Sequence, residues 1–154
     1  MAENIQSSEE ESELFDVSEK DIFKFTSEFP SGNNKGIPNH YHICVKTEDA
    51  YMIFNCCTSQ SGKVQDRMKF FGRTYVKVLH IKNTGFTQDT FVDCDNVFTL
   101  TNEEFANYCS EGKIQFSGIL AGSDYQEVVK VYYQVKWSRR IQKNSSDSCL
   151  FVFV

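Results

Sequence analysis

Hydrophobic and polar residues alternate in several short stretches of this chain, the period-two pattern of strands that bury one face. The stretch at 39–60 (NHYHICVKTEDAYMIFNCCTSQ) stands out, because it predicts two buried strands joined by a polar turn at 47–49. Further strands are predicted at 21–26 (DIFKFT), 75–81 (YVKVLHI), 90–101 (TFVDCDNVFTLT) and 113–117 (KIQFS). Within the stretch at 90–101 we expect a tight turn or bulge at 93–96, because Asp and Asn side chains accept hydrogen bonds from nearby backbone amides.

Two segments have the apolar spacing of helices instead. Thr101 with Glu104 forms a potential capping box before Phe105, and Gly112 ends the short helix this predicts. Ser123 with Gln126 predicts the start of a longer C-terminal helix, whose apolar stripe of core residues is Tyr125, Val128, Val129 and Tyr132. We expect this stripe to pack on the sheet.

Two segments are predicted to be loops. Residues 28–38 (EFPSGNNKGIP) hold both prolines of the chain, and this loop is expected to bring Lys35 close to His40. Residues 61–74 are polar and contain Lys63, Arg67 and a Phe-Phe pair. Basic and aromatic residues mixed in this way suit a loop that faces nucleic acid. A solvated loop that tucks its two phenylalanines underneath itself fits as well.

Composition favours one domain with an acidic leader. The chain has 154 residues, 40% of them hydrophobic, which is enough for one core and too few for two comfortable domains. Residues 1–21 hold eight acidic residues and one lysine, whereas the whole chain has a net charge of only -5, so the remainder is mildly basic. We therefore expect residues 1–19 to form a disordered acidic leader and 20–154 to form a single domain whose weak positive charge permits a nucleic-acid partner.

The chain shows neither a membrane span nor a signal peptide. No stretch approaches the roughly 20 apolar residues that a membrane-spanning helix needs, and the first residues lack the basic-then-apolar pattern of a secretory signal. We expect a cytoplasmic protein, and we interpret its six cysteines as reduced core thiols.

Several of these segments together resemble the MazF/PemK (Kid-type) toxin family, over roughly residues 20–137. The resemblance rests on the FPSGNNKGIP loop, the HYHICVK strand, the strand that ends in Cys57-Thr58-Ser59-Gln60, and TFVDCDNVF followed by GKIQFSG before a closing helix. It implies an α+β, mainly β fold: a small SH3-like antiparallel barrel with a short helix and a C-terminal helix. It also implies a homodimer that cleaves single-stranded RNA as one half of a toxin-antitoxin pair, with a cognate antitoxin protein as partner.

The family's functional residues match this sequence in part. Thr58 and Ser59 stand where the family has its pair of hydroxyls. The family's arginine at the head of the second strand is absent, and Asn39-His40 stands in its place.

The residues present still suit RNA cleavage without metal or cofactor. His40 and His42 are two positions apart on a predicted strand, so we expect both imidazoles on one face, near Thr58 and Ser59. Their unperturbed pKa of about 6.5 allows one to act as general base and the other as general acid. Thr58 or Ser59 would donate to a phosphoryl oxygen, and the cationic side chains that would hold the RNA backbone are Lys35, Lys63 and Arg67.

Other interpretations remain open at this point. The histidines could simply be ordinary residues at an exposed strand end. A zinc site formed by His40, His42 and either Cys56 or Cys57 lacks the usual ligand spacings, and no cysteine is marked as a reactive thiol. The main alternative function is a non-catalytic SH3-like binding module that acts on a protein or on nucleic acid.

Overall fold

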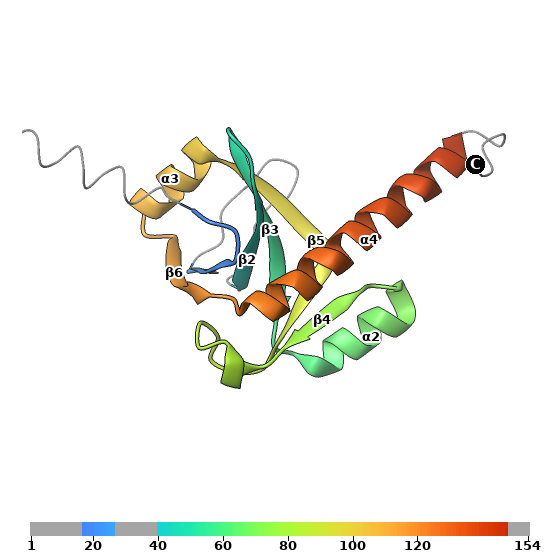
Figure 1. Cartoon of the computed structure of the whole chain (residues 1–154), viewed down its shortest axis with the longest axis horizontal. Helices are drawn as coiled ribbons and strands as arrows, with labels where there is room; N and C mark the ends of the chain where they lie inside the picture. The colour runs from blue at the N-terminus through green and yellow to red at the C-terminus, as the bar shows by residue number, and fades with distance from the viewer. Residues whose placement is uncertain (1–16, 27–39, 148–154) are drawn as a thin grey trace, which may run out of the picture.

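The protein is built on one six-stranded antiparallel sheet (Figure 1). The computed structural model describes residues 17–26 and 40–147, with side chains placed as far as Ser138. The strands follow the order β4-β5-β3-β2-β1-β6 across the sheet. Their bounds are β1 (Asp21–Phe25), β2 (Tyr41–Thr47), β3 (Tyr51–Thr58), β4 (Tyr75–Val78), β5 (Thr90–Thr101) and β6 (Ile114–Ile119).

The hairpin predicted from the sequence forms the centre of this sheet. Strands β2 and β3 pair with His42 opposite Cys56, while β1 flanks β2 and β5 flanks β3. Strands β4 and β6 lie at the two ends and do not pair with each other in the described part of the chain. The α+β class is therefore confirmed, whereas closure into an SH3-like barrel stays a prediction.

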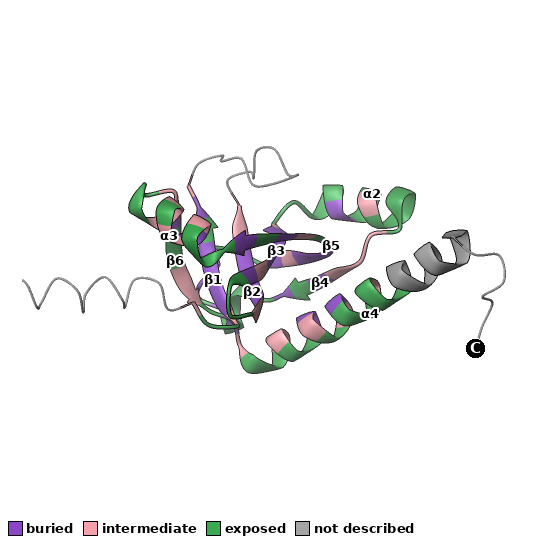
Figure 2. Cartoon of the chain, turned by 90° about the horizontal axis from the view of Figure 1, so that it is seen from above, coloured by how far each residue is buried: buried purple, intermediate pink, exposed green. Residues whose placement is uncertain are grey.

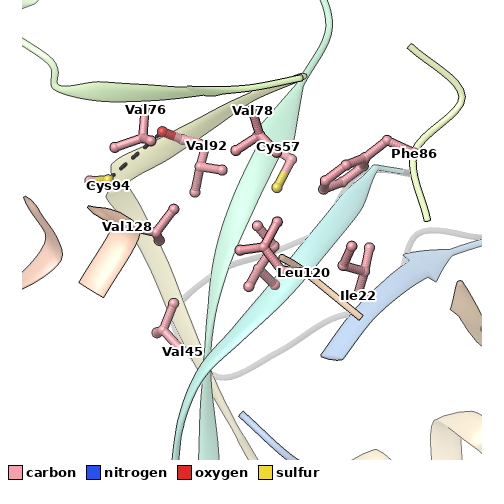
Figure 3. Packing of buried hydrophobic residues seen from close by; sticks show 11 residues of the cluster. Ile22, Val45, Cys57, Val76, Val78, Phe86, Val92, Cys94, Leu120 and Val128 are labelled. Atoms are coloured by element: carbon pink, nitrogen blue, oxygen red, sulfur yellow. Dashed lines mark hydrogen bonds between the residues drawn. The ribbon is translucent and has the colours of Figure 1, made fainter. Parts of the chain in front are cut away.

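Each face of the sheet is covered by a different helix. On one face lies α4 (Gly122–Asp147), whose Val128 and Tyr132 are buried as the predicted stripe requires, although the helix continues through polar residues to Asp147. The core beneath α4 joins residues from five strands with Phe86 and Leu120 (Figure 3). On the other face lies α3 (Asn102–Ser110), which begins with the predicted capping box between Thr101 and Glu104.

The core on the α3 side is rich in aromatic rings. Phe105 from α3 belongs to one cluster with Phe23, Phe25, Phe54 and Phe98 of the sheet, and rings in contact within it have centroids 5.2–6.1 Å apart. Each fully buried Phe contributes about 1.5–3 kcal/mol of hydrophobic stabilisation. Figure 2 shows the buried residues concentrated in the sheet and on the side of α4 that faces it. No helix in the described segments is long and apolar enough to cross a membrane.

The expected loop at 61–74 is wrong, because this segment begins with a helix, α2 (Ser61–Phe71). Val64, Met68 and Phe71 have helical spacing, but only Val64 is buried, and no side chain caps the helix at its start. The helix ends at Gly72, whose φ of 62° is the left-handed conformation that glycine adopts without strain. Phe70 and Phe71 are 68% and 75% exposed, so they are not tucked beneath the segment.

The predicted strand at 75–81 is also shorter than expected. Strand β4 ends at Val78, and His80–Lys82 form a single 3-10 turn. The side chain of Asp89 accepts a hydrogen bond of 2.8 Å from the backbone amide of His80, which holds the chain in this turn.

The bulge predicted at 93–96 lies in the middle of β5. Asn55 of β3 pairs with Val97, but the next residue, Cys56, pairs with Asp93, so three residues of β5 are extra. Asp93 Oδ1 accepts hydrogen bonds from the backbone amides of Asp95 (3.0 Å) and Asn96 (3.2 Å).

The second oxygen of Asp93 joins the bulge to neighbouring residues. Oδ2 accepts from Arg73 Nη1 at 3.0 Å and from the Tyr75 hydroxyl at 3.1 Å. The side chain is only 3% exposed. A buried carboxylate with four donors is well satisfied, and it stabilises the bulge only while all of them are present.

Removal of this carboxylate is expected to destabilise the fold. Asp93→Ala removes the acceptor of four donors: the two backbone amides of the bulge, Arg73 and Tyr75. This change should lower the free energy of unfolding by about 3–5 kcal/mol. Asp93→Asn keeps an acceptor oxygen for the backbone amides and should cost less. Urea unfolding followed by circular dichroism measures both. Equal stability of Asp93→Ala and wild type would show that the bulge does not need the carboxylate.

His42 is a core residue of the α3 side. It has no exposed surface, its ring stacks on Phe25 with centroids 4.1 Å apart, and it makes a T-shaped contact with Phe98 with centroids 5.0 Å apart. Its Nδ1 lies 2.9 Å from the backbone oxygen of His40, to which it donates, while Nε2 has no hydrogen-bond partner among the described residues. Burial lowers the pKa of His42 to about 3, so the imidazole is neutral at physiological pH.

This lowered pKa makes stability depend on pH with a definite sign. In the unfolded chain His42 binds a proton near its ordinary pKa of 6.5, whereas the folded protein binds it only near pH 3. Between these values the unfolded state holds more protons, so the stability present above pH 6.5 is lost as the pH falls, by about 1.4 kcal/mol per pH unit from this group.

We predict that His42→Phe flattens this dependence. The phenyl ring fits between Phe25 and Phe98 and cannot bind a proton, so the wild type should lose more stability than the variant as the pH drops from 6.5 to 4. Chemical unfolding at several pH values measures the free energy of unfolding of both proteins. The carboxylates, which both proteins share, contribute equally and cancel when the two profiles are subtracted. Parallel pH profiles would contradict the burial of a neutral His42.

Candidate functional site

An open groove lies where β2 begins, β3 ends and α2 follows. Its cavity measures about 150 Å³ and contains His40, Thr58, Gln60, Lys63 and Arg67 along its walls. Antiparallel pairing of β2 with β3 explains why His40 and Thr58 lie close together, because it sets the start of β2 beside the end of β3. Helix α2 begins three residues after Thr58 and adds the two cations.

His40 is held at the mouth of β2 by its backbone. Its carbonyl oxygen accepts a hydrogen bond from the amide of Phe25 at 3.1 Å as well as the one from His42. The side chain is half-buried. Partial burial lowers the pKa of His40, and the positive charges of Arg67 and Lys63 lower it further. The neutral imidazole is therefore favoured at neutral pH, and it can accept a proton from a bound ligand.

Arg67 is anchored through the side chains that support the β5 bulge. Its Nη1 donates to the Tyr75 hydroxyl at 3.4 Å, and that hydroxyl donates to Asp93 at 3.1 Å. A guanidinium has five N–H donors, so this anchor leaves donors that can bind a ligand in the groove. Because Asp93 is also paired with Arg73 at 3.0 Å, its negative charge is largely compensated. Lys63 and Arg67 then make the groove suited to an anion.

Thr58 lies at the junction of two hollows. Its Oγ1 accepts a hydrogen bond from the amide of Gln60 at 3.2 Å, and a hydroxyl that accepts in this way keeps its proton for donation to a ligand. A second cavity of about 260 Å³ also has His40 and Thr58 among its walls. Its remaining walls come from Lys24, Tyr41, Cys57, Ser59, Thr87, Gln88 and Thr90.

The structure brings together some of the residues predicted from the sequence and separates others. His40, Thr58, Lys63 and Arg67 share the groove, and Ser59 lines the adjoining cavity. The two imidazoles do not share an open face, because His42 lies inside the core and cannot touch a ligand in the groove. Lys35 lies outside the described residues.

Sequence reasoning missed three residues that shape the site. In the sequence, Gln60 is only the last residue of the Cys57-Thr58-Ser59-Gln60 motif, whereas in the structure it lines the groove. The pattern predicts Tyr75 only as part of the strand at 75–81 and Asp93 only as part of the bulge, yet together they anchor Arg67. Only the bulge signal at Asp93 was visible in the sequence, because the Tyr75 and Arg67 contact depends on a helix that the pattern did not predict.

The cysteines beside the groove are poor nucleophiles. Cys56 and Cys57 line it but are almost fully buried. Burial raises the pKa of the Cys56 thiol to about 12 and that of Cys57 well above its ordinary value, so both are protonated at neutral pH. Among the side chains described in residues 17–26 and 40–138, no three of His, Cys, Asp or Glu gather in a way that could hold a metal ion.

Comparison with known protein families and with curated proteins identifies no relative of this chain. No protein-family model matches the chain, and a search of curated proteins finds no significant match. The resemblance to the MazF/PemK family therefore rests on the sequence motifs alone.

Proposed function

We propose that this protein is a MazF/PemK-like endoribonuclease that cleaves single-stranded RNA without a metal ion. The observation that carries the proposal is the groove in which a half-buried histidine, a hydroxyl and two cations meet: His40, Thr58, Lys63 and Arg67. Transfer of a phosphoryl group within RNA needs a base, an acid and positive charge at the phosphate, and this set of side chains can supply all three.

The reaction would begin at the ribose next to the scissile phosphate. Neutral His40 accepts the proton of the 2′-hydroxyl, and the 2′-oxygen forms a bond to phosphorus. Arg67 and the Thr58 hydroxyl stabilise the negative charge that develops on the phosphoryl oxygens. The bond to the 5′-oxygen then breaks, and this oxygen takes a proton from the Lys63 ammonium. The products are a 2′,3′-cyclic phosphate and a 5′-hydroxyl.

In this mechanism Arg67 supplies the positive charge that the family takes from another position. The family's strand arginine is absent at Asn39-His40. Arg67 reaches the same groove from α2 and is anchored there by Tyr75. The acid-base pair of His40 and His42 is not part of the mechanism, since His42 is fully buried. Its hydrogen bond to the His40 carbonyl gives it a positioning role instead.

The biological setting of the proposal comes from the resemblance. A toxin of this family would be cytoplasmic, would form a homodimer on an SH3-like barrel, and would be inhibited by a cognate antitoxin. The cationic groove supports an anionic substrate such as RNA.

We predict that purified protein cuts single-stranded RNA in the presence of EDTA. His40→Ala removes the base and should reduce kcat by roughly 10²- to 10⁴-fold. Arg67→Gln removes the charge at the phosphate, and a loss of roughly 10²- to 10³-fold is expected, as for other donors to a developing anion. A gel assay with an end-labelled RNA measures the rates, and circular dichroism verifies that each variant is folded.

Two exposed residues provide matched controls. His80→Ala and Lys77→Gln remove the same kinds of groups from positions that do not line the groove, and both variants should keep wild-type activity. If His40→Ala and Arg67→Gln also keep it, the proposed roles are wrong. If the wild type cuts no RNA, the endoribonuclease proposal fails and the non-catalytic binding module becomes the better account.

A further inference from the structure

We infer that the 260 Å³ cavity beside the groove is a nucleobase pocket, which binds the base adjacent to the scissile phosphate and makes cleavage selective for that base. The inference rests on the proposed function, and it adds a binding site that the catalytic groups do not require. We call this cavity the base pocket. Its walls are Lys24, His40, Tyr41, Cys57, Thr58, Ser59, Thr87, Gln88 and Thr90.

The position of the base pocket fits a nucleotide that is already bound in the groove. Both hollows share His40, Cys57 and Thr58, so they meet at the residues that would act on the phosphate. A nucleotide whose phosphate lies against Arg67 can therefore extend its base past Thr58 into the base pocket. With about 260 Å³, the base pocket is smaller than the usual 300–1,000 Å³ of sites for drug-sized ligands, which suits a single base.

The chemistry of the two hollows differs in the way that a nucleotide requires. The groove presents Lys63 and Arg67, with Asp93 already paired to Arg73. The base pocket has a single lysine, Lys24, and presents the neutral hydrogen-bonding side chains of Ser59, Thr87 and Gln88. A carboxamide offers both donors and an acceptor, the combination that reads the edge of a base. Cationic side chains bind phosphate, and neutral donors and acceptors distinguish one base from another.

An aromatic wall completes the base pocket. The half-buried ring of Tyr41 makes a T-shaped contact with the buried Phe86, with centroids 5.4 Å apart, and the Lys24 ammonium lies over the Tyr41 ring at 5.6 Å from its centroid. Bases in single-stranded RNA make favourable contacts with aromatic rings, largely regardless of their sequence. Tyr41, with Lys24 beside it, can therefore contact a base of any identity, while the neutral side chains of the base pocket discriminate between bases.

The backbone of the segment that carries the exposed Gln88 side chain is fixed before a ligand binds. The Thr90 hydroxyl donates to the Gln88 carbonyl at 2.9 Å, and Asp89 accepts from the His80 amide at 2.8 Å. Phe86, two residues earlier, is 1% exposed and belongs to the core under α4. A preorganised binding segment loses little conformational entropy on binding, which favours selectivity.

The inference predicts a change of specificity in Gln88→Ala. Wild-type protein and variant are each incubated with a randomised single-stranded RNA pool in EDTA, and the cut ends are sequenced. We expect the wild type to prefer one base beside the cut and Gln88→Ala to reduce that preference about fivefold or more, since one good base contact is worth roughly 1–3 kcal/mol of discrimination. Gln126→Ala, an exposed glutamine on α4, is the matched control and should keep the wild-type preference.

A binding experiment separates failure of the base pocket from failure of the catalytic proposal. Titration calorimetry measures the affinity for 2′-deoxy dinucleotides, which cannot be cleaved, and for inorganic phosphate. Gln88→Ala should weaken binding of the preferred dinucleotide about fivefold or more and leave phosphate binding unchanged. Arg67→Gln should weaken both. This result would support the base pocket even if the wild type cut no RNA. Equal dinucleotide affinity in wild type and Gln88→Ala, or an unchanged cleavage preference, would overturn it.

Discussion

The candidate site depends on one buried carboxylate, that of Asp93 in the bulge of β5. Its two oxygens accept hydrogen bonds from two backbone amides of the bulge, from Arg73 and from Tyr75. A carboxylate in the protein interior is tolerated only with such donors, so these bonds must form together when the sheet forms. The Tyr75 hydroxyl in turn accepts a hydrogen bond from Arg67. This chain of hydrogen bonds connects the buried bulge to the groove. The interaction that stabilises the bulge therefore also decides where the cation of the site lies.

The central sheet could be predicted from the sequence because its signals are local. The hairpin at 39–60, the bulge at Asp93 and the capping box at Thr101 each depend on residues close in the chain, and all three are present. Helix α2 was missed because its apolar stripe is nearly unused: Val64 is buried, whereas Met68 and Phe71 are exposed. An exposed helix rich in charged residues has a pattern that hardly differs from that of a polar loop.

The site itself was predicted only in part, for a physical reason that His42 illustrates. Alternation along a strand tells which residues share a face, but it does not tell whether that face is open or covered. The α3 side of the sheet is filled by phenylalanines, and His42 stacks between them. His40 escapes this burial because it precedes β2, at the rim of the sheet. Periodicity thus found the right residues and could not separate the one in the core from the one in the groove.

The most direct test of the account concerns the electrostatic contact between α2 and His40, because the proposed chemistry requires Lys63 and Arg67 beside a neutral imidazole. NMR titration of the three histidines measures it without any substrate. The account predicts a His40 pKa below 6.5 in the wild type and a higher His40 pKa in Arg67→Gln, since one of the charges that lowers it is gone. In the same spectra His42 should remain neutral until the pH approaches about 3. A His40 pKa at or above 6.5 that does not change in Arg67→Gln would contradict the account.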